Sequence, residues 1–179
     1  MPIITYSGKR KGAVAKETTD KGYCSTKSMY YHGIKLHALA YQRPNRLPFP
    51  ESIVITPASE NDLNAFKHNW GNIPNRAFYG DKIYIDTEFF SNVRDECNST
   101  MLTPVKGVRN QPENIKQMDK AANDLFSTAV SRIRQPIEAL FNWLIEKTDI
   151  QRASRVRSTN GLLVHVFGRI AAAYIFLIF

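Results

Sequence analysis

AFYGDKIYID, residues 77–86, is a short apolar run that stops at Gly80-Asp81 and then resumes. Apolar residues bounded by turn residues are typical of a buried strand, and the alternation of Ile83, Tyr84 and Ile85 predicts that the strand continues. Asp81 stands where the first part of the strand ends. In open α/β sheets, a carboxylate at the carboxyl end of a strand lies where ligands and metals bind. An aspartate here is also a common turn former or helix cap, so the surrounding sequence has to decide between the two readings.

The sequence on either side of this stretch predicts an α/β domain with one mixed sheet, antiparallel at first and parallel later, flanked by helices. The basic, glycine-containing stretch at residues 8–27 predicts an exposed loop, and three prolines predict a turn at residues 42–50. The strands expected from β-forming and alternating residues are 2–6, 30–41, 52–56 and 101–105, the second and third forming an antiparallel hairpin. Residues 57–62 are expected to open a first helix, with Ser59 as its cap. Three further helices are expected at residues 87–97, 114–148 and 161–179, and Pro136 is expected to break or kink the helix at 114–148.

The chain is basic, with 179 residues, a net charge of +8 and a pI of about 9.6. Lysine and arginine outnumber acids in residues 1–43 and 131–179, whereas residues 44–130 are mildly acidic. A basic chain favours an anionic partner, nucleic acid first and an acidic membrane surface second. This distribution suits carboxylates that bind a metal within a ring of phosphate-binding cations. A solvated basic surface without a specific partner is the alternative interpretation.

Cysteine usage and apolar runs restrict the class of protein. Cys24 and Cys97 are the only cysteines and form no C-x-x-C pair, which argues against a zinc site and fits a reducing, cytoplasmic compartment. The N-terminus does not have the pattern of a signal peptide. Residues 170–179 are ten continuous apolar residues, half of the ~20 needed to span a bilayer. We therefore expect a buried core helix there and no membrane partner.

A second group of residues that could carry chemistry is Arg134-Gln135-Pro136-Ile137-Glu138. Arg134 and Glu138 are four residues apart, so they lie on the same face of a helix. An apolar stripe that would dock this helix on the sheet consists of Ile137, Leu140, Phe141 and Leu144. Spacing alone favours an ordinary surface ion pair next to a core stripe over a functional site.

Four segments carry recognisable combinations of residues; in chain order they are Tyr31-His32-Gly33-Ile34-Lys35-Leu36-His37, Thr56-Pro57-Ala58-Ser59-Glu60-Asn61-Asp62, Gly80-Asp81-Lys82-x-Tyr84 and Arg134-x-x-x-Glu138. Together they resemble the DDE transposases of bacterial insertion sequences. They are similar to that family's G-x-K-x-H strand, its T-P-A-x-x-x-D segment, its G-D-K-G-Y turn and its R-x-x-x-E helix. They occur in the family's order and span most of the chain.

The resemblance implies an RNase H-like fold and an enzyme that cuts and rejoins DNA using Mg²⁺ or Mn²⁺. In such enzymes carboxylates hold two metal ions for an in-line phosphoryl transfer. The resemblance assigns Asp81 and Glu138 as catalytic metal ligands. It implies DNA contacts for Arg134, Lys82, Lys35 and His37, although a structural role suits Lys35 and His37 equally well. It also implies DNA as the partner, a possible homodimer and a cytoplasmic, nucleoid-associated location.

The sequence also departs from the family pattern. The family's first catalytic aspartate precedes residues that resemble Met1-Pro2-Ile3, and here no acid occurs before Glu17. Relatives often have a glycine at the position of Ile83, a tyrosine at that of Ser131 and a lysine at that of Ile145. We therefore expect residues 1–179 to form one catalytic domain that is incomplete at its N-terminus, lacks the start of the first strand and is impaired in catalysis. A catalytically inactive DNA-binding remnant is the alternative, and an unrelated basic RNA-associated α/β protein is a third interpretation.

Overall fold

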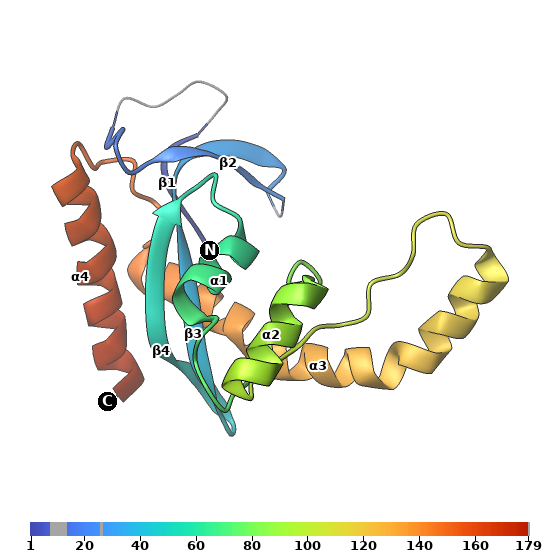
Figure 1. Ribbon diagram of the computed structural model, residues 1–179. Coiled ribbons are helices and arrows are strands. Elements are labelled where there is room, and N and C mark those ends of the chain that lie inside the picture. The colour runs from blue at the N-terminus through green and yellow to red at the C-terminus, as the bar shows by residue number, and fades with distance from the viewer. Residues whose placement is uncertain (8–13, 26, 179) are drawn as a thin grey trace. The chain divides into compact units, whose positions relative to one another are not determined.

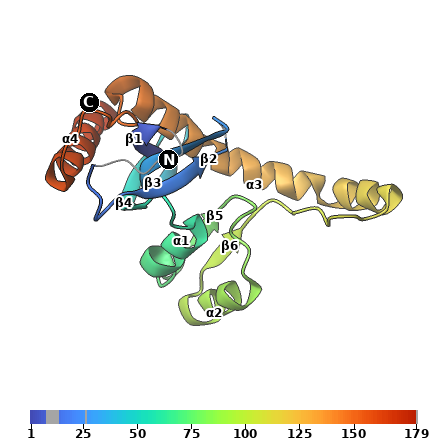
Figure 2. The ribbon, with the colours of Figure 1, turned by 90° about the horizontal axis from the view of Figure 1, so that it is seen from above.

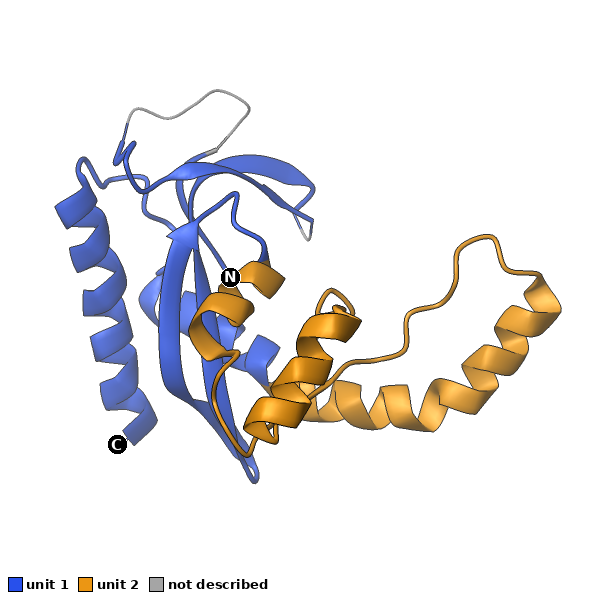
Figure 3. Ribbon diagram, in the orientation of Figure 1, with its two compact units in different colours: residues 1–61, 137–179 blue, residues 62–136 orange. Residues whose placement is uncertain are grey.

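The computed structural model describes residues 1–7, 14–25 and 27–178 (Figure 1). The chain divides into two compact units: unit 1 comprises Met1–Asn61 and Ile137–Phe179, and unit 2 comprises Asp62–Pro136 (Figure 3). In chain order the elements are β1 (Pro2–Ser7), β2 (Asp20–Cys24), β3 (Met29–Arg43), β4 (Arg46–Pro57), α1 (Asp62–Trp70), β5 (Ala77–Tyr79), α2 (Thr87–Cys97), β6 (Thr100–Leu102), α3 (Glu113–Thr148) and α4 (Thr159–Ile178).

Unit 1 contains an antiparallel sheet in which β3 pairs with β1, β2 and β4. The hairpin predicted between residues 30 and 56 is confirmed as β3 and β4. The turn predicted over residues 42–50 is confirmed only for Pro44 and Asn45, which alone join the two strands; Asn45 has a left-handed backbone (φ 54°). Pro48 and Pro50 lie inside β4. Pro50 pairs with Ala40 at a shift in register, where a residue without an N–H is tolerated.

The loop predicted over residues 8–27 is wrong in part, because β2 lies within it. Asp20 pairs with Gly33 and Cys24 with Met29 on β3. The sequence DKGYC has no apolar alternation, so only pairing with β3 makes it a strand. Residues 8–13 and 26 of the predicted loop lie outside the described part of the chain.

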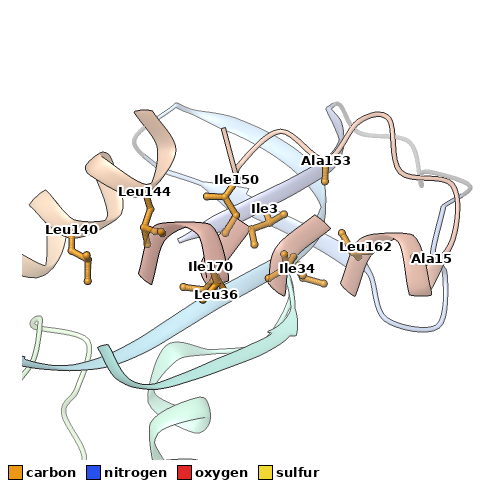
Figure 4. Close-up of a cluster of buried hydrophobic side chains, with 12 residues drawn as sticks. Ile3, Ala15, Ile34, Leu36, Leu140, Leu144, Ile150, Ala153, Leu162 and Ile170 are labelled. Carbon is orange, nitrogen blue, oxygen red and sulfur yellow. The ribbon is translucent and has the colours of Figure 1, made fainter. Parts of the chain in front are cut away.

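The core of unit 1 lies between one face of this sheet and two helices. Ile34 and Leu36 of β3 are buried, as the predicted alternation requires, together with Ile3 of β1. They pack against residues of α3, α4 and the segment between them, as Figure 4 shows for Leu140, Leu144, Ile150, Ala153, Leu162 and Ile170. That segment also pairs with β1: Ile4 N donates to Gln151 O over 2.8 Å, and Ala153 N donates to Ile4 O over 2.9 Å.

Gly33 lies where β1 and β3 approach most closely. A Cβ at this position would be 2.0 Å from the carbonyl oxygen of Ile3. This distance is far inside van der Waals contact, and the obstacle is backbone that cannot rotate away. The glycine of the G-x-K-x-H segment is therefore required by the packing of the sheet.

Unit 2 contains a two-stranded parallel sheet and two short helices, seen side by side in Figure 2. Phe78 of β5 pairs with Met101 of β6. Phe66 of α1 is the centre of an aromatic cluster, with ring centroids 5.1–6.3 Å from those of Phe78, Phe90, Tyr84 and Trp70. The bounds predicted for α2 are confirmed. Ser59 does not cap α1, because the helix begins at Asp62 and a turn occupies residues 58 and 59.

The predicted single mixed sheet is wrong, although an antiparallel and a parallel part both exist. Within the described residues, β5 and β6 pair only with each other and form a sheet separate from that of unit 1. Each has three residues. The protein is therefore a mixed α/β fold with two sheets.

The two long C-terminal helices differ from the prediction in one respect each. α3 runs for 36 residues without a break and contains Pro136 in its interior. α4 was expected to be a buried core helix, which is confirmed for one face only: Leu162, Val166, Ile170 and Ala173 are buried in the core. By length and composition α4 is apolar enough to cross a membrane, with a mean hydropathy of 1.9, as many core helices of soluble proteins also are.

Candidate functional site

Asp81 directly follows the parallel strand β5, as predicted. The strand ends at Tyr79, and Gly80 N donates a hydrogen bond to Leu102 O of β6 over 2.9 Å. A Cβ on Gly80 would be 2.7 Å from the ring of Tyr84 and 2.9 Å from Met101 Sδ. The glycine thus lets the chain turn closely over the end of the sheet and places Asp81 in an exposed position.

The residues after Asp81 form a turn, so the strand predicted to resume at Ile83 is wrong. Asp81 Oδ1 accepts a hydrogen bond from Lys82 N over 2.7 Å, and Tyr84 N donates to Asp81 O over 3.0 Å. Ile83 and Ile85 are each 49% exposed. These hydrogen bonds fix the Asp81 backbone and one carboxylate oxygen, as expected for an aspartate that forms a turn.

Tyr84 lies beside Asp81 with its ring packed edge-on against Phe66. Burial raises the pKa of the Tyr84 phenol well above its ordinary value, and the negative charges of Asp62 and Asp81 raise it further. The hydroxyl therefore stays protonated at neutral pH.

Arg134 and Glu138 lie on α3, four residues apart as predicted, on either side of Pro136. Glu138 is exposed and Arg134 is half-buried. The stripe expected to dock this helix is confirmed: Leu140 and Leu144 are buried, and Ile137 and Phe141 pack against the core of unit 1. Packing of the stripe fixes this part of α3 and leaves the Glu138 carboxylate at the surface.

The four predicted DNA contacts lie in different environments. Lys82 is exposed next to Asp81. Lys35 is half-buried and donates to Glu60 O over 2.6 Å. His37 is buried, with Nε2 2.8 Å from the Thr56 hydroxyl. Lys35 and His37 therefore already hold the β3–β4 hairpin and the turn that follows it.

The donors that could hold a metal are carboxylate oxygens, which hard divalent cations prefer. By donor type, Asp81 and Glu138 both fit such an ion. They belong to unit 2 and unit 1, respectively. Among the described residues, no group of three or more His, Cys, Asp or Glu is placed to hold a metal ion.

The ion pair between Lys67 and Asp86, which lies close in sequence to the Asp81 turn, was not identified from the sequence. Asp86 caps α2 by accepting from Phe89 N over 3.0 Å, and its Oδ2 lies 2.5 Å from Lys67 Nζ of α1. The pKa of Asp86 is lowered by the hydrogen bond from Lys67, then by that from Phe89 N. A shallow hollow beside it is lined in part by Tyr84 and Arg94. The position of Asp86 directly before the predicted helix at 87–97 could have identified it as the N-cap. No sequence motif includes Arg94.

The family model described as "Transposase DDE domain" matches residues 7–176, a range that contains Asp81, Glu138 and all four motif segments. A search of curated proteins and a search of solved structures found no match. Proteins with this domain act on DNA, which they cleave and transfer during transposition, and they generally use divalent metal ions. The resemblance to DDE transposases is thus confirmed, and the chain belongs to the transposase DDE domain family.

Proposed function

We propose that this chain carries out metal-dependent DNA cleavage and strand transfer, with Asp81 and Glu138 as ligands of Mg²⁺ or Mn²⁺. One observation supports this most directly. Asp81 is exposed immediately after the parallel strand β5, in a Gly80-Asp81-Lys82 turn, within a chain whose match to the transposase DDE domain covers residues 7–176.

The proposed roles follow from the charge and exposure of each side chain. Divalent ions at such a site would activate a water or a 3′-hydroxyl and neutralise charge on the phosphate. Asp81, held in its turn by Lys82 N, would present its carboxylate to the cation. The phenol of Tyr84 is neutral and therefore adds no charge beside Asp81. The ammonium of Lys82 is exposed, so that it would contact a DNA phosphate.

The remaining DNA contacts that we propose are Arg134, Lys35 and His37. Arg134 lies one helical turn from Glu138, where a guanidinium would bind a phosphate oxygen or orient the carboxylate. Lys35 and His37 would act alongside the structural hydrogen bonds that they already make.

The proposal predicts that Asp81→Asn and Glu138→Gln each abolish strand transfer of DNA ends taken from the sequence that flanks the gene. Loss of a metal ligand removes several kcal/mol of charge stabilisation, and about 4 kcal/mol corresponds to a thousandfold in rate. Asp95→Asn and Glu146→Gln are matched controls, because both are exposed carboxylates on the helices α2 and α3. Equal activity of wild type and both variants in Mg²⁺ and in Mn²⁺ would refute these assignments.

Metal binding gives a readout that does not depend on finding the right DNA. We expect wild type to bind Mn²⁺, measured by electron paramagnetic resonance, and both site variants to bind it at least about tenfold more weakly. The two control variants should titrate like wild type.

A catalytically inactive DNA-binding protein is the second candidate function. The observation that favours it is the net charge of +8, which supports binding to DNA phosphates without requiring a metal site. Such a protein would bind DNA with a steep salt dependence, would not cut it with either metal, and would bind Mn²⁺ no better than its Asp81→Asn variant.

A further inference from the structure

The outward face of α4 is apolar and exposed over most of its length. Val164 is 73% exposed, and four further large residues are 51–66% exposed: Phe167, Ile175, Phe176 and Ile178. Together the exposed parts of these five side chains present on the order of 500 Å² of apolar surface. A contiguous patch of that size is at the upper limit for a monomeric soluble protein and indicates an interaction site.

This face offers no polar side chain to a partner. Between Val164 and Ile178, all the exposed residues of α4 are apolar or glycine: Val164, Phe167, Gly168, Ala171, Ala172, Ile175, Phe176 and Ile178. A protein interface usually contains about one hydrogen bond per 100–200 Å², so a protein bound here would find several of its polar groups without a side chain to bond. The hydrocarbon chains of lipids need no hydrogen bonds, so the face matches the interior of a bilayer better than it matches a protein surface.

The opposite face of α4 is held within unit 1, where the helix lies beside β4 (Figure 1). The Tyr174 hydroxyl donates to Pro50 O of β4 over 2.9 Å. Four residues of this face are buried in the core: Leu162, Val166, Ile170 and Ala173. To cross a bilayer, α4 would have to leave that core. It can lie along the surface of a bilayer with all of these contacts intact.

The charges next to the apolar face have one sign. Residues 150–179 contain four arginines and neither aspartate nor glutamate. Three of these arginines are exposed in the segment that leads into α4: Arg152, Arg155 and Arg157. Cationic side chains next to an apolar helix face are typical of proteins that bind anionic membrane surfaces, because the arginines attract lipid phosphates while the apolar residues enter the bilayer.

We propose that α4 docks unit 1 on the surface of a bilayer that contains anionic phospholipid. Large side chains lie at both ends of the exposed face, at Val164 and Phe167 and again at Phe176 and Ile178. The face is about 20 Å long at a rise of about 1.5 Å per residue, so both ends enter the bilayer only if the helix lies parallel to the membrane plane. Arg155 and Arg157 would then contact the phosphates of the headgroups.

This attachment is peripheral and reversible. The sequence predicted no membrane partner because ten apolar residues are too few to span a bilayer, and docking on the surface requires no span. The surface includes neither Asp81 nor Glu138. Membrane docking therefore stands or falls independently of the assigned metal ligands, and it is measured without DNA or metal.

Flotation of the full chain with phospholipid vesicles tests the proposal. We expect the chain to float with vesicles of equal parts phosphatidylglycerol and phosphatidylcholine, to float less with phosphatidylcholine alone, and to be released by high salt. Phe167→Glu should weaken binding at least about tenfold, since it removes an inserted apolar side chain and adds a charge that the lipid repels. Leu125→Glu, at an exposed apolar residue of α3, is the matched control and should bind like wild type.

The contribution of the arginines is measured separately. Replacing both Arg155 and Arg157 with glutamine should weaken binding to the anionic vesicles at least about tenfold, and should leave binding to phosphatidylcholine alone unchanged. Equal losses on both kinds of vesicle would show that the arginines do not contact anionic headgroups and would overturn that part of the proposal.

Tryptophan fluorescence shows which face enters the bilayer, in variants that keep a large apolar side chain. Brominated phospholipid should quench the fluorescence of Phe176→Trp more than that of wild type, whereas Leu125→Trp should be quenched no more than wild type. Failure of wild type to float with the anionic vesicles, flotation that Phe167→Glu does not weaken, or a chain that stays in the membrane through high salt and alkaline carbonate would each overturn the proposal.

Discussion

The backbone of Ile3 leaves no space for any side chain at position 33, so this residue has to be glycine. The 2.0 Å between a would-be Cβ and Ile3 O means that Gly33→Ala must push β1 away from β3. We predict a loss of about 3 kcal/mol or more in the free energy of unfolding, the upper range for overpacking a core, measured by urea denaturation. Gly107→Ala is the control, because a Cβ there meets nothing within 4 Å. Equal loss in both variants would mean that the contact with Ile3 is not the cause.

At the same scale, the sequence predicted the position of Asp81 correctly and the positions of Ile83 and Ile85 wrongly. A strand that ends at Gly-Asp is a local signal, and the turn hydrogen bonds of Asp81 are also local. Alternating isoleucine and tyrosine is compatible with a strand, but a strand also needs a partner. Beside β5 the partner β6 ends at Leu102, and within the described residues no strand pairs with residues 83–85.

At the scale of elements, Asp86 joins α1 to α2, and its titration predicts how stability depends on pH. Its folded pKa lies below the unfolded value of 3.8, chiefly because of Lys67. The stabilisation is therefore fully present above pH 3.8 and is lost as the pH falls through the lower, folded pKa. We expect Asp86→Asn to lower the melting temperature at pH 7 and to have a progressively smaller effect as the pH falls below 3.8. Thermal melts across this range, with Asp95→Asn as the control, check the prediction; a pH-independent effect would contradict it.

The elements that were predicted well are those with a complete local signal. The bounds of α2 follow from Asp86 as cap and an apolar stripe, and both belong to the helix itself. The polar strand β2 and the prolines inside β4 were missed for the opposite reason. Each depends on pairing with β3, and neither DKGYC nor a proline-rich stretch carries that information alone.

At the scale of the whole molecule, the net charge of +8 predicts how DNA binding responds to salt. Binding that is driven by counterion release weakens linearly on a log–log plot of affinity against salt. We expect Lys82→Ala to reduce that slope by about one, with little effect on folding, because Lys82 is exposed. Lys35→Ala should instead lower stability, because Lys35 Nζ bonds Glu60 O. Fluorescence anisotropy at several salt concentrations measures the slope; an unchanged slope for Lys82→Ala would remove it from the DNA contacts.

The sequence predicted an α/β protein with antiparallel and parallel strands and placed it correctly among the DDE transposases. It did not predict that the strands form two sheets, because β5 and β6 carry no signal for which strand lies beside them. The exposure of one face of α4 was also missed, since a helix that is apolar on all sides looks the same in sequence whether one face or both are covered.

The discontinuous path of unit 1 has a consequence for how the protein is made. Its sheet comes from Met1–Asn61, but the helices that cover the sheet come from Ile137 onward. On the ribosome, β1, β3 and β4 therefore emerge with Ile3, Ile34 and Leu36 uncovered while the whole of unit 2 is still to be translated. Unit 2 is contiguous in sequence, so its β5–β6 sheet and aromatic cluster can form before the helices that cover the sheet of unit 1 are translated. We therefore expect the nascent chain to pass through a stage in which the first unit exposes a bare apolar sheet, the stage at which it is most exposed to aggregation.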